Sequence, residues 1–209
     1  MSRARAVGSP LLAACVGAAL ACAHPGHVAA QSAFSFGGGI GGFTGGDFSG
    51  TPPGPTIGAA VHLPFEDEGT EIGLGVEYSR YGGHGFVGAT TQLDYSGTIR
   101  RQVAPGAPEV WLGVKVGYST RSLSVVEEPA RTDGFLMGPA VSLRAPVALG
   151  ASLDLSMELP YHTYEELIMY ASREHGTDQD GLRFVLRMGL MVPVPAWGRE
   201  DGETSPGGW

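Results

Sequence analysis

Residues 181–194 read GLRFVLRMGLMVPV, and this stretch decides the fold class. Apolar side chains occupy every second position from Leu182 to Val194, and Arg183 and Arg187 fall between them. Successive side chains of a β-strand leave opposite faces, so a period of two predicts a strand with one apolar and one polar face.

The same alternation recurs along the chain and predicts eight strands. These cover residues 33–43, 56–65, 71–81, 91–103, 108–120, 134–145, 151–161 and 181–194. The connections are alternately long (residues 45–55, 82–90, 121–133 and 162–180) and short (66–70, 104–107 and 146–150). An even number of strands, with long loops at one end and tight turns at the other, is typical of membrane barrels. The pattern predicts an all-β, eight-stranded antiparallel up-and-down transmembrane β-barrel.

The composition of the polar face indicates which side of this sheet is inside. It is rich in small residues: Gly73, Gly75, Gly113, Gly117, Gly189, Ser96, Ser142, Ser152 and Ser156. It also carries four acids and five bases: Glu77, Asp94, Asp154, Glu158, Arg100, Lys115, Arg144, Arg183 and Arg187. Small residues fit the narrow interior of an eight-stranded barrel, and charges in a closed lumen must be paired. We therefore expect a polar, salt-bridged lumen, in which Asp154 and Glu158 pair with Arg183 or Arg187.

The apolar face should then contact lipid. We expect the aliphatic side chains Leu112, Val114, Leu153, Leu155, Leu186 and Leu190 to point outward. Aromatic residues gather near the strand ends, where interfacial girdles lie: Phe34, Phe36, Phe43, Phe65, Tyr78, Tyr81, Tyr118, Phe135, Tyr161 and Trp197. The first and eighth strands should pair, because lipid does not tolerate an open sheet edge.

The ends of the chain have a different character. Residues 1–30 resemble a signal peptide, with Arg3 and Arg5 before an apolar stretch and small residues at 28–30. Cleavage after Ala23 and a lipid-anchored Cys15 are alternatives. The barrel would cover residues 31–197, and residues 198–209 a polar tail. Both cysteines lie in the signal, so the mature chain would have no disulfide or thiolate metal site. Its net charge would change from −8 to −10, which with a single lysine argues against nucleic-acid binding.

In these features the chain resembles the small eight-stranded outer-membrane barrels of the OmpA/OmpX type. The resemblance covers residues 33–194 and rests on the alternation of strands and loops. It implies an outer-membrane protein that sits in lipid as a monomer. The C-terminus departs from the family pattern, in which the last strand ends on an aromatic residue: here Trp197 or Trp209 would take that place.

The sequence offers only weak chemical motifs. Gly37, Gly39 and Gly42 match a dinucleotide fingerprint by letter, but no βαβ unit surrounds them. Four histidines remain after cleavage, namely His62, His84, His162 and His175, without metal-ligand spacing. The segment His162-Thr163-Tyr164-Glu165 could supply a base and a hydroxyl to a lipid-modifying enzyme. We predict no catalytic residue, no cofactor and no metal ligand.

The sequence therefore predicts a cell outer-membrane protein with a structural, adhesive or interaction role, because eight strands leave no open pore. The termini and short turns should lie in the periplasm. An unknown extracellular partner would contact the long loops. A lipid-modifying enzyme and a secreted, soluble lipocalin-like barrel that binds a small apolar ligand are the alternatives.

Overall fold

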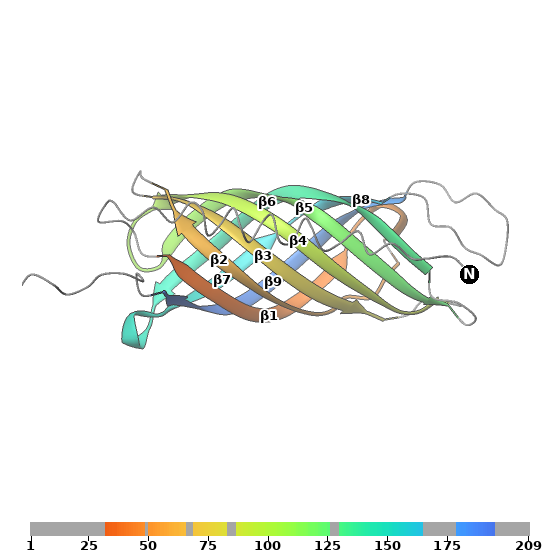
Figure 1. Cartoon of the computed structure of the whole chain (residues 1–209), viewed down its shortest axis with the longest axis horizontal. Helices are drawn as coiled ribbons and strands as arrows, with labels where there is room; N and C mark the ends of the chain where they lie inside the picture. Colours follow the sequence, from red (N-terminus) through yellow and green to blue (C-terminus); the bar gives the residue numbers. More distant parts are fainter. Residues whose placement is uncertain are drawn as a thin grey trace, which may run out of the picture.

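The computed structural model describes residues 32–48, 50–65, 69–82, 87–125, 130–164 and 179–194. They form one antiparallel sheet that closes into a barrel (Figure 1). Its strands are β1 (Ala33–Phe43), β2 (Gly54–Pro64), β3 (Thr70–Tyr81), β4 (Val87–Ala104), β5 (Glu109–Val125), β6 (Ala130–Pro146), β7 (Ser152–Glu158), β8 (Tyr161–Tyr164) and β9 (Gln179–Pro193). Two short 3-10 turns, η1 (Gly46–Phe48) and η2 (Ala148–Gly150), lie outside the sheet.

Strands β7 and β8 are two parts of the single seventh strand of the barrel. Both pair with β6 and with β9, and the register is the same on either side of the break. The break falls at Leu159 and Pro160, which lie opposite Pro139 and Gly138 of β6. Proline has no N–H to donate, so two ladder bonds are missing here. The Leu159 amide still donates to the Pro139 carbonyl, and the Arg183 amide to the Pro160 carbonyl. The barrel therefore has the eight strands that the sequence predicts.

The sheet closes as expected, because β1 pairs with β9 from Ala33↔Pro193 to Phe43↔Arg183. The strands are strongly tilted. A path of paired residues that leaves β1 at Phe34 crosses every strand and reaches Leu182, whose carbonyl accepts a hydrogen bond from Thr44. After one turn around the barrel the path therefore returns beside Thr44 and not beside Phe34. This offset is the stagger that accompanies strand tilt in small barrels. Figure 1 shows the strands crossing the long axis obliquely.

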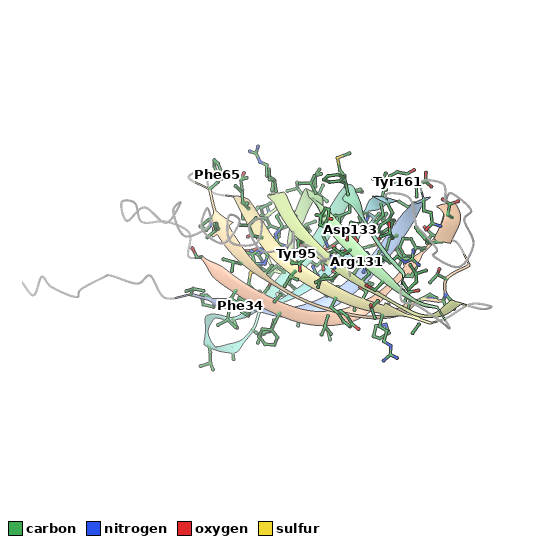
Figure 2. The ribbon with its side chains drawn as sticks, turned by 45° about the vertical axis from the view of Figure 1, so that its right-hand side comes forward. Phe34, Phe65, Tyr95, Arg131, Asp133 and Tyr161 are labelled. Atoms are coloured by element: carbon green, nitrogen blue, oxygen red, sulfur yellow. The ribbon has the colours of Figure 1, made fainter. Side chains whose placement is uncertain are left out.

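The outer wall of the barrel is apolar. The exposed fraction is 62% for Ile57, 67% for Phe135 and 59% for Met188. The aliphatic side chains predicted to point outward do so: Leu112, Val114, Leu153, Leu155 and Leu186 are exposed and Leu190 is half-buried on the same face. Figure 2 shows Phe34 and Phe65 near one end of the barrel and Tyr161 near the other. No helix among the described residues is long and apolar enough to cross a membrane.

Two expectations about the outer wall were wrong. Phe43 and Tyr81, which we assigned to the aromatic girdle, are 5% and 1% exposed and point into the lumen. Phe43 lies an even number of residues from Ala33, and Tyr81 lies an even number from Glu77. Ala33 and Glu77 face inward, so Phe43 and Tyr81 do as well.

The structure also differs from the prediction in strand length. Residues 121–125 and 130–133, predicted as loop, extend β5 and β6, and residues 87–90 extend β4.

We call the end where β1 begins and β9 ends the turn end. It carries the short connections β2–β3, β4–β5 and β6–β7, and the opposite end is the loop end. The predicted signal peptide at residues 1–30, Trp197 and the tail at residues 198–209 lie outside the described residues.

Candidate functional site: the lumen

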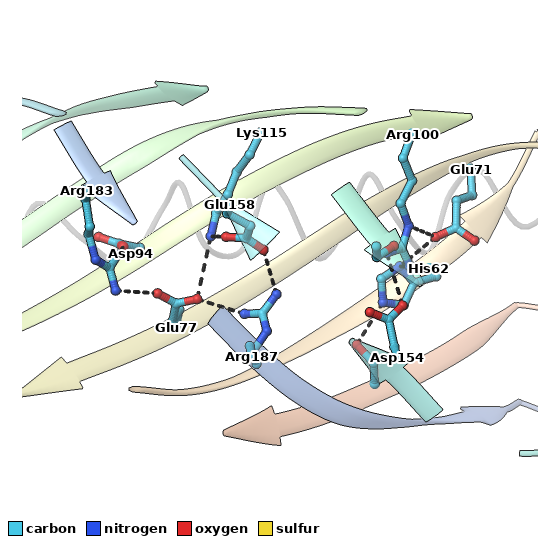
Figure 3. Close-up of polar contacts among 12 residues, drawn as sticks. His62, Glu71, Glu77, Asp94, Arg100, Lys115, Asp154, Glu158, Arg183 and Arg187 are labelled. Atoms are coloured by element: carbon cyan, nitrogen blue, oxygen red, sulfur yellow. Dashed lines mark hydrogen bonds and ion pairs between the residues drawn. The ribbon is translucent and has the colours of Figure 1, made fainter. Parts of the chain in front are cut away.

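The lumen is filled at three depths, which we call the turn-end cluster, the central cluster and the loop-end plug. The two clusters are made of ion pairs (Figure 3), and the plug is mainly aromatic. All three arise from the same local rule. Residues of one phase on each strand point inward, so charged and aromatic residues two apart in the sequence line the interior.

The turn-end cluster consists of His62, Glu71, Arg100, Arg144 and Asp154. Glu71 accepts hydrogen bonds from Arg100 Nε and, at 3.0 Å, from Arg144 Nη2. Arg100 Nη1 lies 3.2 Å from Asp154 Oδ2, and its Nη2 lies 3.1 Å from His62 Nδ1. Each of the two carboxylates therefore contacts both arginines. The longest of these contacts, between Arg144 Nε and Asp154 Oδ2, is 3.8 Å.

Local sequence makes room for this cluster and covers it. A Cβ atom at Gly73 would lie 3.2 Å from His62 Nδ1, so glycine leaves space for the imidazole ring. Trp111 points inward and is covered by Arg144, whose Cζ lies 4.5 Å from the ring centroid. Its indole N–H donates to Glu109 at 3.0 Å. The tryptophan and the two arginines close the lumen near the turn end.

The central cluster consists of Glu77, Asp94, Lys115, Glu158, Arg183 and Arg187. Glu77 accepts from Arg183 Nη2 at 2.6 Å and from Arg187 Nη1 at 2.7 Å. Glu158 accepts from Lys115 Nζ at 2.6 Å and from Arg187 Nη2 at 2.7 Å. Arg183 also donates to Asp94 at 2.5 Å. Buried charges are costly unless paired in this way, and here each charged group meets at least one of opposite sign.

A cavity of about 60 Å³ lies between the two clusters. Its wall includes small residues such as Gly58, Ala60, Gly75 and Ser156. A polar cavity of this size has room for several ordered waters, which would bridge the clusters.

The loop-end plug consists of Phe43, Phe48, Tyr81, Arg121, His162 and Tyr164. The rings of Phe43 and Phe48 lie 4.9 Å apart, and that of Tyr164 meets Phe48 edge-on at 5.5 Å. Tyr164 Oη lies 3.1 Å from His162 Nδ1 and 3.2 Å from Ser119 Oγ, which donates to Asp94. The plug is thus joined to the central cluster by hydrogen bonds.

The nine predicted lumen residues all face the interior and fall into the two clusters. Their pairing differs in part from our expectation. Glu158 contacts Arg187 as anticipated, but Asp154 contacts Arg100 and Arg144. The register explains this, because Arg144 lies directly opposite Asp154 on β6, whereas the β9 residue opposite Asp154 is Gly189.

Sequence reasoning missed several lumen residues, namely Glu71, Trp111, Arg121, His162 and Tyr164. Glu71 and Trp111 were within predicted strands and share the phase of Glu77 and Lys115. Arg121, His162 and Tyr164 lie in segments that the sequence predicts as loops, residues 121–133 and 162–180. Continuing the alternation past the predicted strand ends would have found these three.

The alternative chemistries have little support here. His162 is 0% exposed and bonded inside the plug, so it does not face lipid as an interfacial base would. His62 lies in the turn-end cluster, and His84 and His175 lie outside the described residues. Those described residues include no group of three or more metal-ligand side chains with suitable geometry. The polar interior and apolar wall are the reverse of a lipocalin, so that alternative is not favoured.

Comparisons with known proteins agree with this geometry. No protein-family model matches the sequence, and no curated protein is detectably similar to it. Several solved structures share its fold. Neisserial surface protein A (NspA) is similar over 78% of this chain and 95% of its own, with 10% identity and a TM-score of 0.57. Outer membrane protein OprG from Pseudomonas aeruginosa is similar over 81% and 99%, with 11% identity and a TM-score of 0.53.

The fold is that of a small outer-membrane barrel. A third similar structure, outer membrane protein AlkL in lipid bilayers, covers 82% of this chain and 94% of its own at 11% identity, with a TM-score of 0.50. The predicted fold class and its resemblance to small eight-stranded barrels are confirmed. The apolar outer wall is what a barrel in lipid presents, in agreement with the predicted location in the outer membrane.

Proposed function

We propose that this barrel is a closed, monomeric outer-membrane protein that acts at the cell surface through the segments at its loop end. One observation carries the proposal: side chains fill the lumen at three depths. The ion pairs of the two clusters join opposite walls, as Arg183 of β9 does with Glu77 of β3. A barrel blocked in this way offers a rigid support rather than a passage.

A monomer is favoured because the sheet has no free edge. Strands β1 and β9 pair along their length, so neither of the two strands that close the barrel offers an unpaired edge to another copy. Surface-exposed connections of a rigid scaffold are the usual place for contacts with partners. The extracellular partner in this proposal is therefore one that contacts the loop end.

Conductance of the purified protein in planar lipid bilayers tests the closed lumen. We expect no stable open-channel steps at neutral pH, with a larger general porin as the positive control. The double variant Arg183→Ala/Arg187→Ala removes two cations from the central cluster and serves to show that a widened lumen would be detected. Regular conductance steps from the wild-type protein would contradict the proposal.

Cysteine labelling tests which end faces outward, because the predicted mature chain has no cysteine. Gly50→Cys places a thiol in the β1–β2 connection, where a Cβ atom meets open space. Ala107→Cys places one in the exposed β4–β5 turn. On intact cells, we expect a membrane-impermeant maleimide to label the first variant and not the second. The reverse pattern would place the loop end in the periplasm and remove the surface role.

A further inference from the structure

Arg121 differs from the other buried cations of the lumen. Five of them have an ion-paired carboxylate: Arg100, Lys115, Arg144, Arg183 and Arg187. Arg121 is 2% exposed and has no carboxylate partner among the residues that the structure describes. Among those residues its charge is therefore buried without an opposite charge, an arrangement that protein interiors generally avoid.

The surroundings of Arg121 compensate only part of this charge. Its guanidinium Cζ lies 3.7 Å from the ring centroid of Phe48 and 5.1 Å from that of Phe43. Stacking on a ring uses the flat face of the guanidinium and leaves its N–H edge free for hydrogen bonds. Two edge atoms, Nε and Nη1, are buried and have no hydrogen-bond partner in the part of the chain that the structure describes.

Two other inward-facing polar atoms at the loop end are also without partners among the described residues. Tyr81 Oη and Thr56 Oγ1 are buried donors that make no hydrogen bond. Thr56 belongs to the row of paired residues Thr56–Ser79–Gln92–Arg121, and the Tyr81 ring lies 5.6 Å from Phe43. A buried guanidinium with unused N–H donors is a group to which a carboxylate can bind through charge-assisted hydrogen bonds.

We propose that the loop-end plug binds the carboxylate of a small organic anion at Arg121. A single unpaired cation matches a monoanion better than a phosphate dianion. The rings of Phe43, Phe48 and Tyr164 provide an apolar wall for the rest of the ligand. Phe48 covers the guanidinium from η1, outside the sheet, so the ligand can displace this ring without breaking a ladder hydrogen bond.

The test uses sodium benzoate as the probe and the folded full-length protein in detergent micelles. The measured quantity is the temperature at which half of the protein loses its compact gel mobility. A ligand that binds only the folded state raises this temperature with its concentration. We expect benzoate to raise it, neutral benzamide to leave it unchanged, and inorganic phosphate to have a smaller effect than benzoate.

Two arginine variants locate the effect. Arg121→Met should abolish the benzoate shift, whereas Arg131→Met, at an exposed arginine on the outer wall, should keep it. An equal shift in Arg121→Met, or none in the wild type, would overturn the proposal. If Arg121→Met does not fold, the side-chain Nε–H resonance of Arg121 in the ¹⁵N-labelled wild type decides. It should move on benzoate titration and not with benzamide, and an unmoved resonance would equally overturn the site.

Discussion

The central cluster and the loop-end plug bury the same chemical group in opposite ways. Arg183 in the cluster is 0% exposed and has two carboxylates and a serine hydroxyl around it. Arg121 in the plug is nearly as buried, yet aromatic rings cover it and no carboxylate of the described residues contacts it. The comparison shows that one barrel can pair its buried charges at mid-depth and leave another buried charge without a described carboxylate near the loop end.

The largest expected effect on the unfolding free energy comes from removing an arginine of the central cluster. Arg183→Met leaves Asp94 without its ion partner and removes one of the partners of Glu77. Loss of one partner of a buried pair typically costs about 3–5 kcal/mol of unfolding free energy. Urea unfolding in lipid vesicles measures the loss. Arg121→Met is the matched control and should lose no more than about 2 kcal/mol, because it removes the cation–π contact with Phe48 but leaves no described carboxylate without its partner. Equal losses in the two variants would remove the contrast between the regions.

The outer wall gives the next largest effect. Met188 lies near the middle of the apolar run on β9 and is 59% exposed. Met188→Arg places a charge in lipid and should cost about 2–4 kcal/mol near the bilayer midplane. Val192→Arg, closer to the turn end on the same face, should cost about 0–1 kcal/mol. The same vesicle unfolding assay compares them. Similar costs at the two depths would argue against a bilayer around this wall.

Phe48 gives a smaller effect that sharpens the description of the plug. Phe48→Leu keeps apolar burial but removes the ring face on which Arg121 stacks. A desolvated cation–π contact contributes about 2 kcal/mol, so we expect a loss of that size in wild type. In an Arg121→Met background the same change should cost less. A double-mutant cycle measures this coupling, and a coupling of zero would show that the ring only fills space.

The smallest effect is expected on the surface. Arg131 and Asp133 form an ion pair at 3.3 Å, with side chains 65% and 36% exposed. Such pairs contribute about 0–1 kcal/mol and are screened by salt. Arg131→Met should therefore leave the unfolding midpoint almost unchanged, in contrast to Arg183→Met. If Arg131→Met lost as much unfolding free energy as Arg183→Met, the difference in solvent exposure between the two arginines would not explain their contributions to stability.

The period of two in the sequence was enough to predict the barrel and its inside-out polarity. It assigned Leu186 to lipid and Arg187 to the lumen because neighbouring residues of a strand must leave opposite faces. It also predicted that strands one and eight close the sheet, since lipid leaves no edge unpaired. Strand ends were less well predicted. Arg121 and His162 lie where alternation continues into segments rich in polar residues, which resemble loops.

Only the tertiary structure decided which charge meets which. The alternation of side chains along its strand predicts that Asp154 points inward. It does not predict the distance along the barrel axis between Asp154 and each arginine. That position depends on the stagger accumulated around the closed sheet, which no single strand contains. The same stagger brings η1 and β8 to one end, where Phe48 covers Arg121 and Tyr164. Alternation is a property of one strand, whereas contacts across a lumen depend on the register of all of them.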